Sequence, residues 1–116
     1  MTKMINQNYI RIWETVKAIP KGKVASYGQI SDLAGLPGRS RFAGTALANT
    51  PSDIKIPWYR VLRSSGQIAF PKGSEKALEQ KTLLMDEGVE VNNLRVNLKH
   101  FGWQPTVDEL LFKLKY

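Results

Sequence analysis

Three adjacent side chains in the stretch IPWYRV, residues 56–61, bring together an indole, a phenol and a guanidinium. Trp58 offers a flat surface, but its indole N–H only donates hydrogen bonds and has no lone pair for nucleophilic attack. Tyr59 adds a hydroxyl, Arg60 adds a permanent positive charge, and Pro57 fixes the backbone in front of them. The stretch therefore predicts either the floor of a site that stacks a flat ligand or core packing at the end of a loop.

The side chains that usually carry catalysis are scarce in the rest of the chain. There is no cysteine, which excludes disulfides, thiolate metal sites and a cysteine nucleophile. The one histidine, His100, stands beside aromatic residues and is interpreted as structural, while Asp32 and Asp53 stand alone. The chain has no HExxH, Walker A or GxGxxG motif, and GKVASYG (22–28) lacks the residue order of a phosphate loop. We expect no metal and no nucleotide cofactor.

The charge of the chain is concentrated in one part of it. Lysine and arginine number 17 against 10 acidic residues, a net charge of +7. Residues 1–73 hold 11 of the basic and 3 of the acidic side chains, whereas residues 74–116 hold 6 and 7. A basic face of this kind favours a nucleic-acid partner, although a basic protein without such a partner is the alternative.

The residues ahead of IPWYRV predict three helices. The first spans residues 4–17, where one apolar stripe recurs at helical spacing: Ile5, Tyr9, Ile12 and Val16, widened by Trp13. Ser26 and Gln29 form a capping box, so a second helix should begin at Tyr27, and Gly35 should end it. The third runs from about Ser40 to Ala48. The last two helices, joined by a tight turn, are typical of a helix-turn-helix.

The third predicted helix suits close contact with DNA better than it suits sequence reading. Arg39 and Arg41 stand at its start, and Ala43, Gly44 and Ala46 give it a small-residue side. Small side chains let a helix approach the minor groove, which is only about 6 Å wide. A transcription factor would instead need long polar side chains here to read the major groove. The alternative is close helix–helix packing with the arginines in solvent.

The second half of the chain completes a mainly α fold. Residues 60–63 and 67–70 flank SSGQ and predict a small β hairpin, or wing. A helix should start after Ser74, with Glu75 in its first turn and Gly88 behind it, and should turn Leu78, Leu83, Leu84 and Met85 to the core. Residues 89–98 alternate as short extended pieces, and Thr106 with Glu109 predicts a C-terminal capped helix whose apolar residues are Val107, Leu110, Leu111 and Leu114. The prediction is a winged-helix-like helix-turn-helix DNA-binding domain.

Four segments together resemble one known family. IPKGKVASYGQISDLAG, PGRSRFAGTALANTP, IPWYRVLRSSGQIAF and LLMDEGVEV match, in order and spacing, the DNA-binding domain of O6-alkylguanine-DNA alkyltransferases. The resemblance runs from about residue 10 to residue 103. It predicts one DNA-binding domain over residues 1–103, with residues 104–116 as a C-terminal helical extension packed on the same domain.

The resemblance implies a scaffold without its reaction. The active-site motif of those enzymes is Pro-Cys-His-Arg-Val, and its cysteine takes the alkyl group from a flipped-out guanine. Here the motif reads Pro57-Trp58-Tyr59-Arg60-Val61. This is similar to alkyltransferase-like proteins, which carry tryptophan or alanine at the cysteine position, bind the lesion and hand it to nucleotide excision repair. Tyr59 departs from the histidine or phenylalanine expected at that position.

The family's DNA-contacting roles carry over by position. Tyr27 matches the tyrosine that pushes a phosphate and helps to rotate the nucleotide, and packing on the wing is the alternative. Arg41, fourteen residues later, matches the arginine finger that fills the gap in the base stack, and a phosphate contact is the alternative. Such a filler offsets part of the few kcal/mol that extrusion costs. The remaining DNA-contacting positions are expected to be Arg39, Ala43, Gly44, Leu47 and Asn49.

The loop AFPKGS (69–74) corresponds to the segment that borders the alkyl pocket in the enzymes and is about two residues longer. Lys72 would place a cation over the flipped base, although a solvated lysine is the alternative. Val61, Ser64 and Ser65 are expected in the pocket or the wing. The added length predicts room for bulkier adducts.

These expectations combine into one hypothesis. The protein binds double-stranded DNA containing O6-alkylguanine through the minor groove, flips the base to Trp58 and flags it for nucleotide excision repair proteins, without alkyl transfer. We expect a monomer in the cytoplasm, with no cofactor, no metal and no membrane segment. The alternatives are a helix-turn-helix transcriptional regulator and a base-processing repair enzyme such as a glycosylase, which would need a carboxylate or lysine beside Trp58.

Overall fold

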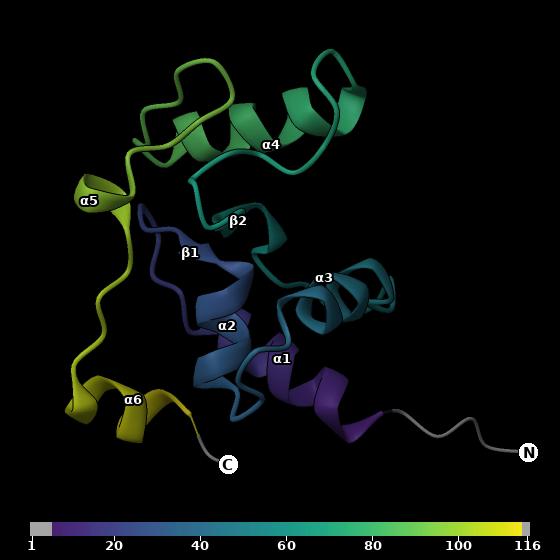
Figure 1. Ribbon diagram of the computed structural model, residues 1–116, viewed down its shortest axis with the longest axis vertical. Coiled ribbons are helices and arrows are strands. Elements are labelled where there is room, and N and C mark those ends of the chain that lie inside the picture. Colours follow the sequence, from purple (N-terminus) through teal and green to yellow (C-terminus); the bar gives the residue numbers. More distant parts are fainter. Residues whose placement is uncertain (1–5, 115–116) are drawn as a thin grey trace, which may run out of the picture.

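The protein is mainly helical and contains one small sheet. The computed structural model describes residues 6–114 (Figure 1). In chain order the elements are α1 (Gln7–Lys17), β1 (Ala25–Ser26), α2 (Tyr27–Leu33), α3 (Ser40–Ala48), the 3-10 helix η1 (Trp58–Arg60), β2 (Val61–Leu62), α4 (Glu75–Asp86), α5 (Leu98–Phe101) and α6 (Val107–Lys113). The predicted mainly α class with a helix-turn-helix, formed here by α2 and α3, is confirmed.

The sheet divides the molecule into two cores. Strands β1 and β2 pair in parallel, with Ala25 opposite Val61 and Ser26 opposite Leu62. Successive side chains of a strand point to opposite faces. Ala25 and Val61 accordingly belong to a core shared with α1, α2 and α3, whereas Leu62 and the neighbouring Val24 belong to a second core beneath α4. In Figure 1 the sheet lies between α4 above and the three N-terminal helices below.

The first core is built from the faces that the sequence predicts. Ile12 and Val16 of α1 are wholly buried, and Tyr9 is partly buried against them. Trp13 also turns inward, and its indole N–H donates to the carbonyl of Ala46 at 2.8 Å. This bond ties α1 directly to the backbone of α3. The predicted member Ile5 lies outside the described residues.

The caps that start three helices are confirmed. The hydroxyls of Ser26, Ser74 and Thr106 accept hydrogen bonds from the backbone N–H groups of Gln29, Ala77 and Glu109 respectively. Each bond satisfies a donor that the first turn of a helix leaves free. Gly35 and Gly88, behind α2 and α4, adopt the positive φ values of +80° and +86° that favour glycine.

The buried face of α4 differs from the prediction. Leu84 is wholly buried, but Leu78 and Met85 are 64% and 53% exposed. The helix instead buries Ala77 and Gln80, which share a face with Leu84 at steps of three and four residues. The prediction is wrong for Leu78 and Met85, because the position of a residue around the helix and not its hydrophobicity decides which face is buried. Gln80 lies at the centre of the buried face.

The predicted hairpin is wrong in its pairing. The chain does reverse at residues 63–67, where Arg63 N–H donates to Gln67 carbonyl at 2.9 Å. However, β2 pairs with β1, and Ile68 donates its N–H to Leu94 rather than to a partner in residues 60–63. The strand partners are therefore distant in sequence, and the turn chemistry of SSGQ alone does not reveal them.

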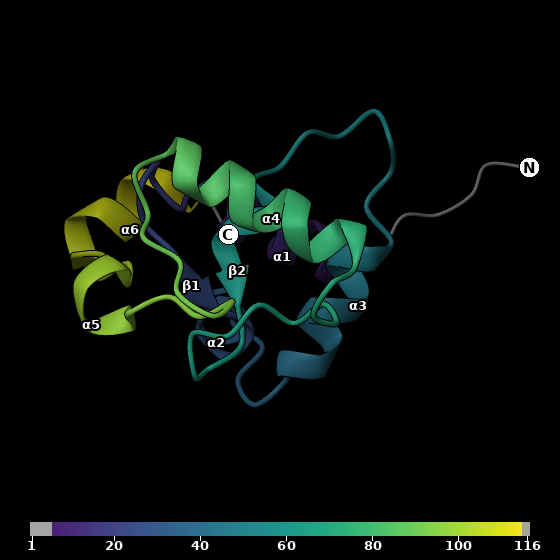
Figure 2. The same cartoon turned by 90° about the horizontal axis from the view of Figure 1, so that it is seen from above.

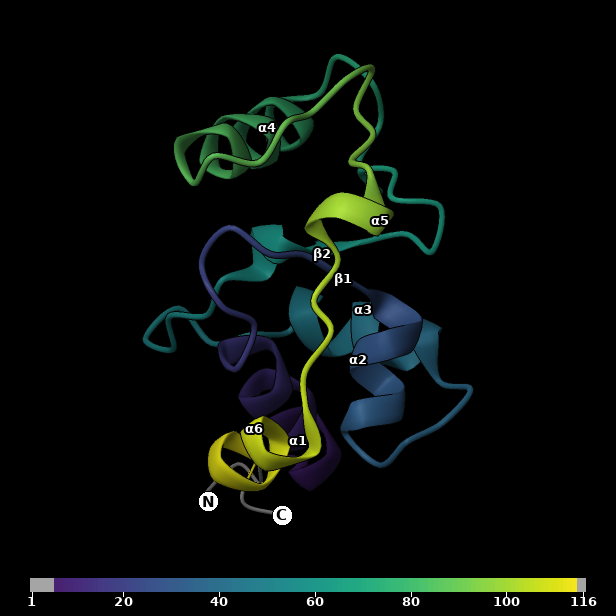
Figure 3. The same ribbon diagram turned by 90° about the vertical axis from the view of Figure 1, so that its left-hand side faces the viewer.

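The C-terminal segment covers the side of the molecule opposite α3 (Figure 3). Val24 donates its N–H to Phe101 and accepts from the N–H of Trp103, so this segment extends the sheet beside β1. Leu110 of α6 and Leu114, the residue that caps the end of α6, pack against the first core, whereas Val107 and Leu111 are more than 70% exposed. Within residues 6–114, no helix is long and apolar enough to cross a membrane.

Candidate nucleic-acid interface

Helix α3 packs with two of its alanines, Ala43 and Ala46, facing inward. Ala43 and Ala46 are wholly buried in the first core, where α3 lies against α1 and α2. The packing alternative is therefore correct for both residues, and the expectation that the side chain of Ala43 lines a DNA-contacting surface is corrected. The outward side of α3 carries Arg41, Thr45 and Ala48, with Gly44 at its margin. This side remains small and carries one charge.

Tyr27 lies beside this outward side of α3. It opens α2 directly behind the Ser26 cap, and a Cβ atom on Gly44 would lie 3.9 Å from its ring. Burial raises the pKa of Tyr27, and the nearby positive charge of Arg63 opposes that rise. The tyrosine therefore keeps its proton at neutral pH. Arg63, an exposed residue behind β2, is a neighbour that the sequence did not indicate, because the turn that carries it is far from Tyr27 along the chain.

The arginines that open α3 differ in their surroundings. The guanidinium of Arg39 lies over the ring of Phe42, 4.7 Å from its centroid. Arg41 is exposed in the first turn, and its carbonyl accepts a hydrogen bond from the Thr45 hydroxyl at 3.1 Å. Both arginines are exposed, and Arg39 is the one that stacks on a ring of its own helix.

The other end of α3 is closed by side-chain hydrogen bonds. The amide of Asn49 donates to the carbonyl of Thr45 at 2.8 Å, and the hydroxyl of Thr50 donates to that of Leu47 at 2.9 Å. Leu47 itself is partly buried against the first core. Asn49 and Thr50 therefore both satisfy carbonyls that the last turn of a helix leaves free.

Trp58 is surrounded by aromatic edges and by one cation. The rings of Tyr59 and Phe70 meet it edge to face, with centroids at 5.8 Å and 6.1 Å. The ammonium of Lys76, in the first turn of α4, lies 3.9 Å from the centroid of its ring. The indole is half-buried, so it is neither a core residue nor freely exposed. No motif around Lys76 indicates this contact, because Lys76 reaches Trp58 only once α4 has folded against η1.

Lys72 agrees with the alternative of a solvated lysine. It lies exposed in the loop before α4 and lines a cavity of about 330 Å³ with Ser74, Leu78, Lys81 and other residues on that side of α4. Trp58 does not line this cavity. The cation over the indole is Lys76.

Arg60 and Glu87 form an ion pair that fixes η1. Arg60 donates from Nε to Glu87 at 2.9 Å and from Nη2 to the other carboxylate oxygen, and from Nη1 to the carbonyl of Ile19 at 2.7 Å. Both side chains are largely buried, at 14% and 8% exposure. Tyr59 and the N–H of Gly22 also donate to Glu87, at 2.9 Å and 3.1 Å. The carboxylate thereby joins η1, the end of α4 and the loop after α1.

The protonation of this cluster follows from these hydrogen bonds. Burial opposes ionisation of Glu87, but the bonds from Arg60, Gly22 and Tyr59 outweigh it and hold the pKa of the carboxyl below its usual value of 4.5. Burial, and then the hydrogen bond to Glu87, raise the pKa of Tyr59. Tyr59 is therefore a neutral donor at physiological pH and holds Glu87 in place.

The backbone of η1 is held by a buried glutamine. The Gln80 amide donates to the carbonyls of Tyr59 and Val61, at 2.9 Å and 3.1 Å. Pro57 precedes the first residue of the 3-10 helix. The side chain of Val61, expected in the pocket or the wing, is wholly buried in the first core. Sequence reasoning missed Gln80 because a buried glutamine has no local signal.

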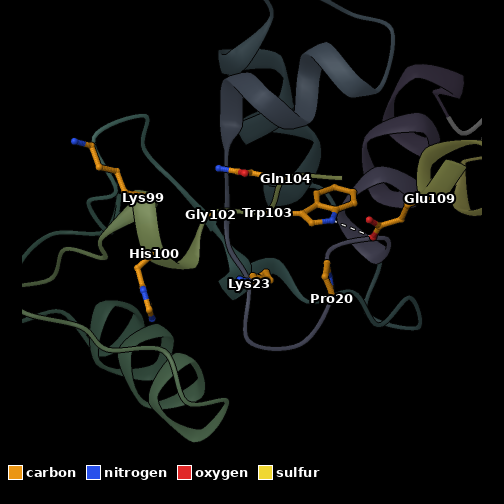
Figure 4. A pocket seen from close by; sticks show the side chains of 8 residues that line it. All are labelled: Pro20, Lys23, Lys99, His100, Gly102, Trp103, Gln104 and Glu109. Carbon is orange, nitrogen blue, oxygen red and sulfur yellow. Dashed lines mark hydrogen bonds between the residues drawn. The ribbon is translucent and has the colours of Figure 1, made fainter. Parts of the chain in front are cut away.

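Other hollows lie away from this cluster. Ser64 and Ser65 are exposed in the turn after β2, at the edge of a shallow hollow completed by Asn92, Arg95 and Lys99. A cavity of about 300 Å³ lies beside Lys23, Lys99, His100, Trp103 and Glu109 (Figure 4). Figure 2 shows α5 and α6 on the side of the molecule away from α3. Nowhere in residues 6–114 do three or more histidine or acidic side chains gather into a metal-binding group.

The chain is similar to proteins that act on alkylated DNA. The family model of the 6-O-methylguanine DNA methyltransferase DNA-binding domain matches residues 7–89. A DNA base-flipping protein of Vibrio parahaemolyticus is 41% identical over 102 residues, which cover 87% of this chain and all of that protein.

Solved structures share the architecture. Atl1 of Schizosaccharomyces pombe, in complex with damaged DNA containing O6-carboxymethylguanine, matches with a TM-score of 0.78 and 31% identity over 89% of this chain and all of that one. Mycobacterium tuberculosis OGT in complex with DNA matches with a TM-score of 0.63 and 32% identity, over 72% of this chain and 51% of that one.

Proposed function

The chain belongs to the family of the 6-O-methylguanine DNA methyltransferase DNA-binding domain, and from this premise we propose that it recognises alkylation damage without repairing it. It binds duplex DNA through the minor groove, rotates an O6-alkylguanine out of the helix and holds the base at Trp58. The lesion then passes to nucleotide excision repair proteins. The protein acts as a monomer in the cytoplasm.

One observation carries this proposal. The segment Pro57–Val61 resembles an alkyl-acceptor site in which the unreactive indole of Trp58 stands at the position of the reactive cysteine. The ion pair of Arg60 with Glu87 and the bonds of Gln80 hold η1 in a fixed geometry, and Trp58 stands in that frame among aromatic edges. Because the chain has no cysteine, no thiolate is available to accept an alkyl group.

The relatives of the chain support a role in base flipping and damage recognition. One is a base-flipping protein, and Atl1 is seen with damaged DNA. In this chain Tyr27 and Arg41 occupy suitable places for the flipping step, because Tyr27 borders the outward side of α3 and Arg41 projects from its first turn. The small outward side of α3 favours contact with a narrow groove over the reading of base edges in the major groove.

Binding titrations test the proposal at Arg41 and Tyr27. We expect the protein to bind a duplex with one O6-methylguanine more tightly than the same duplex with guanine. Arg41→Ala should lower lesion affinity by about tenfold or more, because the extruded base then leaves an unfilled gap that costs a few kcal/mol. Tyr27→Phe keeps the packed ring and removes the hydroxyl, and should weaken binding less. Equal affinity of wild type for the two duplexes would contradict the proposal.

Intact-mass measurements separate recognition from chemistry. After incubation with the lesion duplex, the masses of protein and DNA should both be unchanged. A gain of one methyl group by the protein would reveal transfer. Loss of the base from the DNA would reveal a base-processing enzyme, for which Lys76 beside Trp58 is the residue to examine.

A further inference from the structure

Lys76 occupies the surface on which the proposed site would receive a base. Its ammonium lies 3.9 Å from the centroid of the Trp58 ring, and its side chain is 49% exposed. The first turn of α4, which carries it, lies toward the same side of the molecule as α3 in two perpendicular views (Figures 1 and 2). A base that reaches this indole therefore meets a positive charge at the entrance.

Lys76 already forms a weak ion pair with Glu79. Glu79 lies 3.3 Å from the ammonium, one turn along α4, and is itself 48% exposed. Exposed pairs of this kind contribute little to stability, since water screens both charges and two long side chains must be ordered. Lys76 can exchange Glu79 for another anion at small cost, because its long flexible stem lets the charge follow a ligand.

We propose that Lys76 makes the site selective for guanine adducts that carry a negative charge, such as a carboxylate on the O6 substituent. This inference rests on the proposed function. A base entering against Trp58 displaces the ammonium from the ring. A carboxylate on the adduct replaces the lost cation–π contact with a charge-assisted hydrogen bond, whereas a neutral adduct leaves the ammonium with only Glu79 and water.

The neighbouring charges favour this assignment to one residue. Lys72 lies on the exposed loop and lines a cavity that Trp58 does not line. It therefore adds to the positive potential of the surface but does not contact the indole. Arg60 is directed into its pair with Glu87 and Ile19. Among the described residues, Lys76 is thus the cation that both contacts Trp58 and retains an exposed, exchangeable partner.

The experiment compares two adducts that differ in charge and hardly in shape. Duplexes of one sequence carry O6-carboxymethylguanine, its neutral amide O6-carbamoylmethylguanine, O6-methylguanine or guanine, and affinities are measured by fluorescence anisotropy at one salt concentration. We expect wild type to prefer the carboxylate over the amide by about fivefold, the upper range for a partly exposed pair. Lys76→Gln should reduce this ratio to one or below, and Lys76→Arg should largely retain it.

Two further variants keep the test independent of any one substitution. Glu79→Gln removes the competing anion and should raise the ratio, while Lys72→Gln removes the same formal charge as Lys76→Gln and should leave the ratio unchanged. The same ratio in wild type and Lys76→Gln overturns the proposal about Lys76. Failure of the proposed function looks different, because then O6-methylguanine and guanine duplexes bind equally well to wild type.

Discussion

Glu87 shows how a single buried carboxylate can keep a site in shape. It accepts hydrogen bonds from Arg60 and Tyr59 of η1 and from Gly22 in the loop after α1, which are two separate segments of the chain. Removing one partner of a buried pair is costly because the other charge is left without compensation. Tyr59 has a structural role, because its hydroxyl donates a hydrogen bond to Glu87 and so helps to hold η1, which carries Trp58.

Glu87→Gln is expected to destabilise the protein in a pH-dependent way. The folded pKa of Glu87 lies below 4.5, so its charge stabilises the fold above that pH and the contribution is lost as pH falls through the lower folded value. We expect a loss of about 3 kcal/mol in the free energy of unfolding at pH 7, narrowing steadily below about pH 4.5. Urea unfolding of both proteins between pH 3 and 7 measures this gap.

A matched control is Glu79→Gln, which removes an exposed carboxylate from the same helix. Its stability should change by less than about 0.5 kcal/mol. A gap between wild type and Glu87→Gln that stays constant over the whole pH range would show that the charge of Glu87 contributes nothing.

Single residues were predictable from the sequence where their role is local. Trp58 and Arg41 stand out by type and spacing, and the structure places Trp58 half-buried among aromatic rings and Arg41 exposed. Lys76, Gln80 and Glu87 did not stand out, since their significance arises only when α4 folds over η1. Each of these side chains acts on residues at least 18 positions away, so its own neighbourhood in the sequence carries no pattern.

At the scale of elements, α3 combines a packed side and a bare side. Ala43 and Ala46 let it lie close to α1 and α2, and Gly44 lets the Tyr27 ring lie against it. Both sides of α3 carry small side chains, but for different reasons. On the inner side the core leaves little space, and on the outer side the proposed partner is a narrow groove.

Gly44→Ala should separate stability from binding. Gly44 has no positive φ, and a Cβ would make ordinary contact with Tyr27 at 3.9 Å. Alanine in a helix interior is more favourable than glycine by roughly 0.5–1 kcal/mol, so thermal unfolding should shift upward. The added methyl group beside Tyr27 should weaken lesion binding in the same anisotropy assay. An unchanged affinity would mean that this part of α3 does not approach the DNA.

Helix starts were predictable at three serine or threonine caps, but not at the asparagine caps Asn6 and Asn97 that begin α1 and α5. Ser26, Ser74 and Thr106 start helices as expected, because a cap is a contact between near neighbours. The hairpin prediction is wrong because strand pairing here is not local: β2 pairs with β1, which lies before α2 and α3 in the chain. Two-residue strands carry too little alternation to indicate a partner.

Over the whole molecule, the excess positive charge belongs to residues 1–73, which include α2, α3 and the turn with Arg63. Each basic side chain that neutralises a phosphate releases counterions and adds about −0.9 to the slope of log affinity against log salt. Phosphate contacts hold the protein on any duplex, whereas contacts at the lesion discriminate. Arg63 beside Tyr27 is placed for the first role.

Arg63→Gln should therefore weaken binding to lesion and undamaged duplexes by the same factor. The slope of affinity against salt should become shallower by about 1. Arg95→Gln is the matched control, because it removes an exposed arginine from the nearly neutral part of the chain and should alter neither quantity. A loss of affinity confined to the lesion duplex would place Arg63 at the flipped base instead.

The backbone pairing of Val24 with Phe101 and Trp103 has a consequence for biosynthesis. Trp103 fills the core that α1, α2 and α3 share, and Val24 belongs to the core beneath α4. The second core needs Phe101 and the first needs Trp103, so neither is complete until the ribosome has delivered these residues, and closing such long loops slows folding. Until then the nascent N-terminal helices expose the apolar faces that Trp103 later helps to cover, and exposed surface of this kind is prone to aggregation.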